Sequence, residues 1–313
     1  MINYYTNVNG VVQKLDNFEE NCWINVVAPN HEEISSLTEQ FKLEPDFIRA
    51  CLDPEESSRI ETEEENTLII IDAPVADSKN SDDDFDVVYS TSPFGIIVTP
   101  SNVITMSLNE SVVLTEFSRG FVKNVSTHLK TRFVLQLMLR VSIRFLYYLK
   151  QIDKLSSSLE RQLRKSMKNK ELIELLDVQK SLVYFSTSLK SDETTIEKLT
   201  KGKYLKMYEE DLDLLEDVLI EIKQAIEMSG IYLNIMSGTM DAFASVISNN
   251  LNIVMKILAS LTVVTSIPTI VTGFYGMNIP SGLPFDNAYW PPILISGILM
   301  AAVGWFLYKK NMF

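Results

Sequence analysis

Two uncharged stretches near the C-terminal end constrain the fold of this 313-residue chain more than any other feature. Residues 257–278 contain no charged side chain, and a helix of this length, rising about 1.5 Å per residue, crosses a hydrocarbon core of about 30 Å. A second uncharged run covers residues 287–308, and its Pro291-Pro292 suits the first turn of a helix. We therefore predict transmembrane helices at 257–278 and 291–308.

The charges beside these two helices predict their orientation. Lys256 precedes the first helix, and Lys309 and Lys310 follow the second, so the positive-inside rule places both flanks in the cytoplasm. The loop 279–290 then lies outside, and the tail 309–313 lies inside. Aromatic side chains gather near both boundaries, as in interfacial belts: Phe274, Tyr275, Tyr289 and Trp290 outside, and Trp305, Phe306 and Tyr308 inside. With no signal-peptide pattern at the start, we expect a multi-pass protein of the cell membrane with both termini cytoplasmic.

The charge of the remaining chain excludes several functions. Residues 1–256 carry 26 basic and 40 acidic side chains, a net charge of −14, and the sequence pI is about 4.7. Such a surface repels phosphate backbones, so cations and not nucleic acids are the expected partners. Cysteine and histidine show no metal-ligand spacing, and no catalytic constellation is present: Cys22, Cys51, His31 and His128. The sequence does not indicate an enzyme.

The residues before the first membrane helix form two regions with different secondary-structure patterns. Residues 1–120 predict a cytosolic α+β domain. Its expected strands are Trp23–Val27, Thr67–Ile71, Val87–Thr91, Phe94–Thr99 and Val103–Met106, and its expected helices are Asn30–Phe41 and Asn109–Phe117. Asn30 followed by Glu33 fits a capping box. Residues 121–256 predict a helical domain and stalk, because no proline occurs between Pro100 and Pro268. Long helices are expected at 129–167, 170–199 and 203–275.

One face of the last helix is small and polar. Steps of four and three residues from Asn234 select Asn234, Gly238, Asp241, Ser245, Ser248, Asn252, Met255, Ala259, Thr262, Ser266, Thr269, Gly273 and Gly276. A dry heptad seam holds Leu, Ile or Val instead. One interpretation is that small residues let two membrane helices pack closely. The other is a water-lined path, which also explains why the polar residues share one face.

A water-lined path requires several copies of the chain around an axis, so this interpretation predicts a homo-oligomer. The membrane part of the face holds no carboxylate, so a conducted ion would meet amide, hydroxyl and carbonyl dipoles. Mg²⁺ gives up its water shell reluctantly, which makes it the divalent cation best suited to such a path. No nucleotide-binding motif such as GxxxxGK[ST] occurs, so the driving force is the membrane potential and not a pump.

The end of the first membrane helix carries Gly276-Met277-Asn278. This motif, followed by a short loop and a second helix that ends in lysines, resembles the CorA family of magnesium channels. The resemblance implies a funnel-shaped homopentamer, in which Gly276, Met277 and Asn278 form the selective pore entrance and Asn278 carbonyls hold hydrated Mg²⁺. Co²⁺ and Ni²⁺ are further candidate ions, because their hydrated forms are similar in size.

The resemblance also implies roles along the polar face. Thr269, Leu258, Met255 and Asn252 resemble the pore-facing threonine, the leucine and methionine constrictions, and the inner asparagine of the family. The helical period alone selects Ala259 in place of Leu258, so both stay candidates. Thr262 and Ser266 complete the expected pore lining. A position that often holds methionine in the family is Ser266 here, and the acidic segment after the motif is replaced by residues 279–284.

Carboxylates are expected to bind regulatory Mg²⁺ between subunits. Asp241 resembles a family aspartate at the inner end of the pore helix, and Asp217 resembles a second. We assign their partners on the neighbouring subunit to the acidic loop Asp82, Asp83, Asp84 and Asp86. Divalent ions bound there would screen the repulsion between subunits and close the channel. Two rival functions remain open: a zinc transporter of the same superfamily, and a membrane-anchored sensor or scaffold.

Overall fold

The computed structural model describes residues 1–8, 10–78, 87–166, 169–277, 290–310 and 312. Seven strands are present in these residues: β1 (Ile2–Val8), β2 (Val11–Leu15), β3 (Trp23–Val27), β4 (Arg59–Glu63), β5 (Asn66–Ser78), β6 (Val87–Val98) and β7 (Val103–Ser107). The helices are α1 (His31–Phe41), α2 (Pro45–Cys51), α3 (Val112–Ser118), α4 (Lys130–Ser166), α5 (Asn169–Leu199), α6 (Glu209–Tyr275) and α7 (Trp290–Lys309). The expected order of an α+β domain, long helices and two apolar helices is confirmed.

The strands form one mixed sheet in the order β2-β1-β3-β7-β6-β5-β4. Among the described strands, β3 and β7 are the one parallel pair, and the segment from α1 to β6 provides the long connection that a parallel pair requires. The remaining neighbours pair antiparallel, and β5 and β6 form the longest ladder, from Thr67↔Val98 to Ser78↔Val87. Two predicted strands at Val87–Thr91 and Phe94–Thr99 are therefore a single strand, β6.

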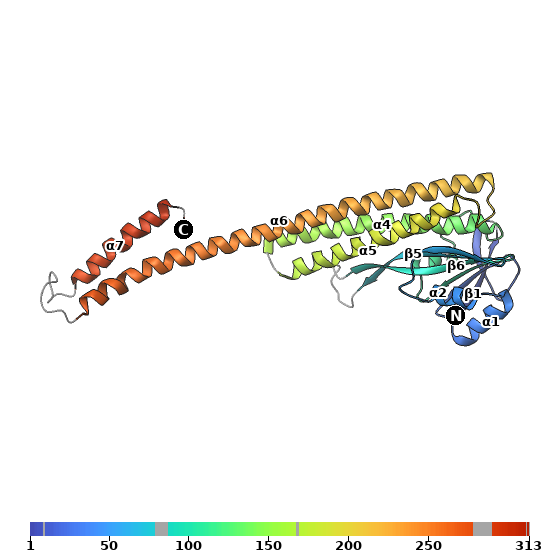
Figure 1. The fold of residues 1–313 in the computed structure, drawn as a ribbon, viewed down its shortest axis with the longest axis horizontal. Helices are drawn as coiled ribbons and strands as arrows, with labels where there is room; N and C mark the ends of the chain where they lie inside the picture. The colour runs from blue at the N-terminus through green and yellow to red at the C-terminus, as the bar shows by residue number, and fades with distance from the viewer. Residues whose placement is uncertain (9, 79–86, 167–168, 278–289, 311, 313) are drawn as a thin grey trace. The chain divides into compact units, whose positions relative to one another are not determined.

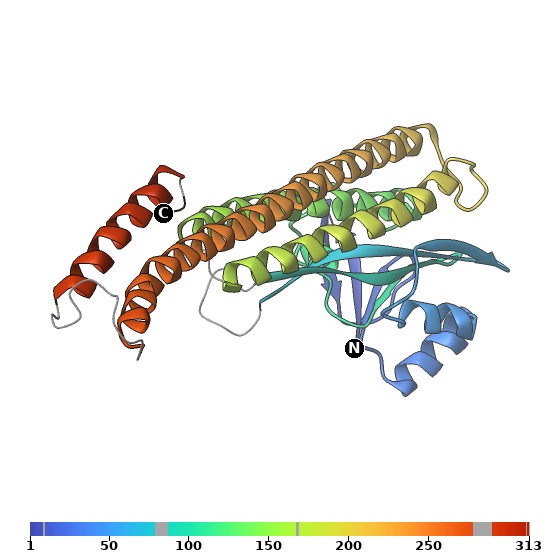
Figure 2. The ribbon, with the colours of Figure 1, turned by 60° about the vertical axis from the view of Figure 1, so that its left-hand side comes forward.

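Helices lie on both faces of the sheet, with α1 and α2 on one side and α4 and α5 on the other (Figures 1 and 2). On one side, Ile24 and Ile70 belong to a core cluster that includes Leu37 of α1 and Phe47 of α2. On the other side the fully buried Trp23 lies 5.4 Å, ring centre to ring centre, from Phe133 of α4. The alternation of strand side chains thus supplies both cores from neighbouring residues of β3.

Local signals fix the ends of two helices. At α1 the capping box is confirmed: Asn30 Oδ1 accepts from the Glu33 N–H at 2.8 Å, and Glu33 Oε2 accepts from the Asn30 N–H at 3.0 Å. The expected start of the last helix at residue 203 is wrong, because α6 begins at Glu209. There Asp211 Oδ2 accepts the Tyr208 N–H at 3.0 Å and satisfies a donor that the first turn leaves unpaired.

The chain divides into two compact units, Met1–Ser237 and Gly238–Phe313. The first contains the sheet and the helices packed on it. The second contains the C-terminal part of α6 and α7, which are the two helices long and apolar enough to cross a membrane in the described residues. Only 6% of the apolar window of α6 and 11% of that of α7 is buried, unlike the core helix of a soluble protein. Pro291 and Pro292 lie in the first turn of α7, as predicted.

Candidate functional site

The candidate site is the polar face of α6 in the second unit. Because α6 is continuous from Glu209 to Tyr275, residues spaced by three and four share one face of the helix. Pro268 lies inside the helix without ending it. The spacing found in the sequence therefore exists as a continuous face in the structure.

A different face of α6 is covered. Ser260 is 1% exposed and Val271 is 8% exposed, and Val264 and Ile267 between them are half-buried. The Ser260 hydroxyl donates to the carbonyl of Met312, just beyond α7, at 3.1 Å. α7 lies beside this end of α6 in Figures 1 and 2. The covered face is therefore the one turned toward α7.

The polar face points away from α7. Successive residues turn by about 100° around a helix axis, so Thr262, Ser266 and Thr269 lie roughly 180–240° from Ser260. All the predicted pore residues of this face are exposed in the single chain: Asn252, Met255, Leu258, Ala259, Thr262, Ser266 and Thr269. The choice between Leu258 and Ala259 stays open, because both are exposed. A surface of polar and apolar side chains thus runs along α6 without a cover from its own chain.

Two hydroxyl groups on this face have partners within the helix. Thr262 Oγ1 donates to the Leu258 carbonyl at 2.8 Å, and Ser266 Oγ donates to the Val263 carbonyl at 2.8 Å. The expectation that such groups need external partners or water is therefore too strong for the hydroxyl hydrogens. The hydroxyl oxygens still have lone pairs available, and these are the groups that can accept hydrogen bonds from the water shell of a cation.

The motif at the outer end is only partly described. α6 ends at Tyr275, and the Gly276 N–H donates to the Thr272 carbonyl at 2.9 Å. A Cβ added at Gly276 would lie 3.2 Å from that carbonyl oxygen, which is closer than ordinary contact. Met277 is 53% exposed. Asn278, assigned to the entrance ring, lies outside the described residues.

The proposed regulatory carboxylates are not brought together within one chain. Asp217 and Asp241 both lie on exposed positions of α6, and Asp241 contributes its carbonyl to a hydrogen bond from Ser245 Oγ at 3.0 Å. Their expected partners Asp82, Asp83, Asp84 and Asp86 lie outside the described residues. In the part of the chain that is described, no group of three or more His, Cys, Asp or Glu side chains could hold a metal ion.

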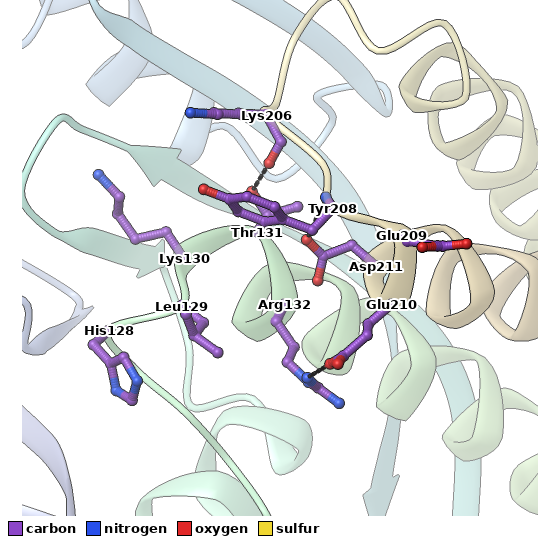
Figure 3. Close-up of a pocket in the computed structure, with 10 residues that line it drawn as sticks. All are labelled: His128, Leu129, Lys130, Thr131, Arg132, Lys206, Tyr208, Glu209, Glu210 and Asp211. Carbon is purple, nitrogen blue, oxygen red and sulfur yellow. Dashed lines mark hydrogen bonds and ion pairs between the residues drawn. The ribbon is translucent and has the colours of Figure 1, made fainter.

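Sequence patterns did not predict a hollow in the first unit, where the first turns of α4 and α6 meet (Figure 3). Its volume is about 740 Å³, and its lining includes both acids and bases: His128, Leu129, Lys130, Thr131, Arg132, Lys206, Tyr208, Glu209, Glu210 and Asp211. Arg132 Nη1 pairs with Glu210 Oε2 at 2.7 Å, and Thr131 Oγ1 donates to the Lys206 carbonyl at 2.8 Å.

Charged groups that line this hollow have partners within the protein. Lys130 Nζ donates to the carbonyls of Thr99, at 3.0 Å, and Pro100, and burial lowers the pKa of this lysine. The acids in the first turn of α6 compensate its helix dipole, and Asp211 already accepts a backbone hydrogen bond. The hollow is therefore a polar junction between two helices, and we assign it no ligand.

These features define a class of protein: a membrane protein with an N-terminal α+β domain, long helices and two C-terminal membrane-spanning helices. Within this class, the model of the CorA-like Mg²⁺ transporter protein family matches residues 18–310. The chain belongs to this family.

Similar proteins match over most of the chain. The cobalt/magnesium transport protein CorA of Methanocaldococcus jannaschii is 27% identical over 299 residues, covering 91% of this chain and 88% of that protein. The magnesium transport protein CorA of Campylobacter jejuni is 24% identical over 292 residues, covering 90% and 87%. The complete structure of the Methanocaldococcus jannaschii CorA magnesium transporter superposes with a TM-score of 0.79 at 25% identity, covering 99% of this chain and 96% of that one.

These findings confirm the predicted family, the fold class and the membrane location. They also bear out the main functional prediction, transport of divalent cations, because the relatives are named as magnesium or cobalt/magnesium transport proteins. The zinc alternative gains no support over magnesium. The pore residues, the regulatory carboxylates, the domain boundaries and the number of subunits stay predictions.

Proposed function

We propose that this chain is the subunit of a channel through which hydrated Mg²⁺ flows into the cell, with Co²⁺ and Ni²⁺ as further candidate ions. The observation that carries the proposal is the exposed polar face of α6, turned away from α7 and continuous from Asn252 to Thr269. Although Thr262 and Ser266 donate within their own helix, the lone pairs of these hydroxyls favour contact with water or a partner at membrane depth. The magnesium transport described for the relatives supports the identity of the ion.

The channel is a homo-oligomer in this proposal, and a pentamer is the form that the family resemblance implies. Two helices of one chain cannot enclose a path, so copies of α6 must surround it. Large apolar side chains beside the polar face support this assembly, because Leu261, Val263 and Ile270 are each about half exposed in one chain. Lipid and neighbouring subunits would cover them. In this arrangement 257–278 lines the path and 291–308 faces the bilayer.

The chemistry of the path suits a cation that keeps its water shell. Hydroxyl and amide oxygens accept hydrogen bonds from bound water, whereas a direct ligand set for Mg²⁺ would need octahedral oxygens at about 2.0–2.1 Å. The C-terminal end of α6 carries roughly half a negative charge from its unpaired carbonyls, and several such ends would concentrate cations at the outer mouth. An interior-negative potential then favours inflow by about 4.6 kcal/mol per 100 mV for a divalent ion.

Closure by internal Mg²⁺ is the regulatory part of the proposal. Asp217 and Asp241 are exposed and free to face a neighbouring subunit, where the loop containing Asp82, Asp83 and Asp84 is the proposed counterpart. Mg²⁺ between these carboxylates would hold the subunits together and close the path. The double variant Asp217→Asn and Asp241→Asn should take up Mg²⁺ even when internal Mg²⁺ is high. Unchanged closure would remove these two residues from the account.

A scaffold in which the helices serve only as anchors is the rival from another class. Such a protein needs no continuous polar face, and its transport activity would be absent. Mg²⁺ uptake in a cell that depends on added magnesium tests the two directly. We expect the wild-type chain to restore growth at low Mg²⁺ and Asn278→Ala to fail, with Asn287→Ala in the predicted outer loop 279–290 as the matched control. Equal rescue by Asn278→Ala would refute the entrance assignment, and no rescue by the wild type would favour the scaffold.

A further inference from the structure

Two aspartates, one buried and one half-buried, lie where α5 meets the edge of the sheet in the first unit. Asp192 of α5 is 1% exposed, and its Oδ1 accepts hydrogen bonds from the Ser58 hydroxyl at 2.6 Å and from the Asp72 N–H at 2.9 Å. Asp72, on β5, is half-buried, and Ser188, one turn of α5 before Asp192, donates its hydroxyl to Thr91 Oγ1 of β6 at 2.9 Å. Residues 120 positions apart in the sequence are thus joined through one side chain.

The position of Asp192 gives one of its two carboxyl oxygens a hydrogen-bonding role. The pairing of β4 with β5 ends at Arg59↔Ile70, so the Asp72 N–H lies beyond the last strand partner on that edge. Asp192 Oδ1 takes the place of the missing backbone acceptor. An asparagine could supply the same oxygen. The second oxygen, Oδ2, is buried and has no hydrogen-bond partner among the described residues.

No basic side chain that the structure describes neutralises this pair. The ion pairs on the surrounding elements use other carboxylates: Arg59 of β4 with Glu56 and Glu61, Arg144 of α4 with Glu116, and Lys223 of α6 with Glu193 and Glu197. A buried Asp192 carboxylate beside the half-buried Asp72 would therefore carry charge without compensation.

We propose that Asp72 and Asp192 form a buried proton-binding site, which holds one proton near neutral pH and thereby ties α5 to β5. The proton comes from solvent and resides on Asp192 Oδ2, the oxygen that lacks a partner, and the Asp72 carboxylate accepts it in a hydrogen bond. Asp72 is the less deeply buried of the two, since it is only half-buried, and it keeps the negative charge. One shared proton between two carboxyl groups relieves their mutual repulsion.

The electrostatics of the pair agree with this geometry. Burial raises the pKa of Asp192 well above its usual 3.8, and the charge of Asp72 raises it further. Burial also raises the pKa of Asp72. The folded protein therefore binds a proton that the unfolded chain releases, so the contribution to stability is fully present below pH 3.8 and is lost as pH rises through the folded pKa. Within that window the folding equilibrium constant should fall by about tenfold per pH unit.

Infrared spectroscopy of the purified full-length protein tests the site. At pH 7 the wild type should show the C=O stretching band of a protonated carboxylic acid, with its shift in D₂O, and the band should disappear as pH is raised. Asp192→Asn should lack the band, because its amide supplies Oδ1 and donates to Asp72 without a proton from solvent. Asp213→Asn, at an exposed position of α6, is the matched control and should keep the band.

Thermal unfolding between pH 5 and pH 9 gives a second readout. Asp192→Asn should flatten the fall of the melting temperature with rising pH, whereas Asp213→Asn should follow the wild type. A wild-type spectrum without the band at pH 7, or an unchanged band in Asp192→Asn, would overturn the proposal. If Asp192→Asn does not fold, the wild-type spectrum alone decides. A melting temperature that Mg²⁺ raises in the wild type but not in Asp192→Asn would also overturn it, because a metal ion would then neutralise the pair.

Discussion

The helix α6 lies in two different surroundings along its length. In the first unit one apolar face of the helix is buried, with Leu215, Val218, Ile222 and Ala225 each at most 2% exposed, whereas Leu212 and Ile220 on another face are exposed. In the second unit Met255 and Leu258 are both 55% exposed, although they are equally apolar. One helix thus has a face that its own chain covers and a continuation that its own chain leaves open.

The difference shows where the chain is complete by itself. The first unit has a large apolar core buried within one chain, and this packing stabilises it. The second unit leaves both apolar side chains and the polar face of α6 exposed in the single chain. In the proposed assembly, its stability and its activity both depend on the bilayer and on other copies. Substitutions in the two units should therefore have different kinds of effect.

Truncation of a core aromatic in the first unit should have the largest effect on stability. Phe133 is fully buried and lies 5.4 Å from Trp23 and 5.8 Å from Phe117, measured between ring centres. Phe133→Ala should lower the free energy of unfolding by about 3–5 kcal/mol. Denaturant unfolding of the purified protein, followed by circular dichroism, measures this.

The matched control for that change is Phe274→Ala in the second unit. Phe274 is 60% exposed, so its truncation should leave the unfolding of the first unit unchanged. Equal losses from both substitutions would contradict the contrast between the units.

A bulky residue on the polar face should affect transport instead of folding. Thr262→Phe places an aromatic ring in the proposed path and should lower Mg²⁺ uptake at least tenfold, with an unchanged unfolding transition of the first unit. Val263→Phe, about 100° away around the helix, should transport nearly normally. Uptake by purified protein in liposomes is the measurement. If Val263→Phe blocked uptake and Thr262→Phe did not, the path would lie on another face.

The smallest expected effect concerns the cap of α1 and its pH dependence. Asn30→Ala should cost roughly 1 kcal/mol at neutral pH, because the Glu33 N–H loses its acceptor. The hydrogen bond from the Asn30 N–H lowers the pKa of Glu33 below its usual 4.5, so its contribution exists above that pH and is lost as pH falls through the folded pKa. In Glu33→Gln, the melting temperature should therefore fall less steeply than in the wild type as pH is lowered through the acid range. If Asn30→Ala lowered the free energy of unfolding by far more than about 2 kcal/mol, Asn30 would have a role in the core.

The sequence predicted the features that have strong local signals. Uncharged runs predicted both membrane helices, and Asn30 with Glu33 predicted the start of α1. The strand β4 was missed because residues 59–63 are mostly charged or polar and lie on the edge of the sheet. The strand β6 was split at Pro93, whose missing N–H is tolerated because β7 pairs only with Gly95–Val98.

The candidate site was predicted in part. Spacing alone identified the polar face, because a helix without interruption keeps that spacing on one side. The partners of the hydroxyls could not be predicted, since Thr262 and Ser266 use carbonyls of their own helix. The Asp72–Asp192 pair had no sequence signal, because its two residues come together only when α5 packs on the sheet.

The accessibility of a single cysteine tests the central claim that the polar face borders water. The native thiols Cys22 and Cys51 are buried, at 1% and 2% exposure, so they should react little. Thr269→Cys in membranes should react with a charged, membrane-impermeant thiol reagent, and the reaction should block Mg²⁺ uptake, whereas Val271→Cys, on the face toward α7, should not react. A Thr269→Cys protein that transports Mg²⁺ yet never reacts, or that reacts without losing uptake, would contradict the claim.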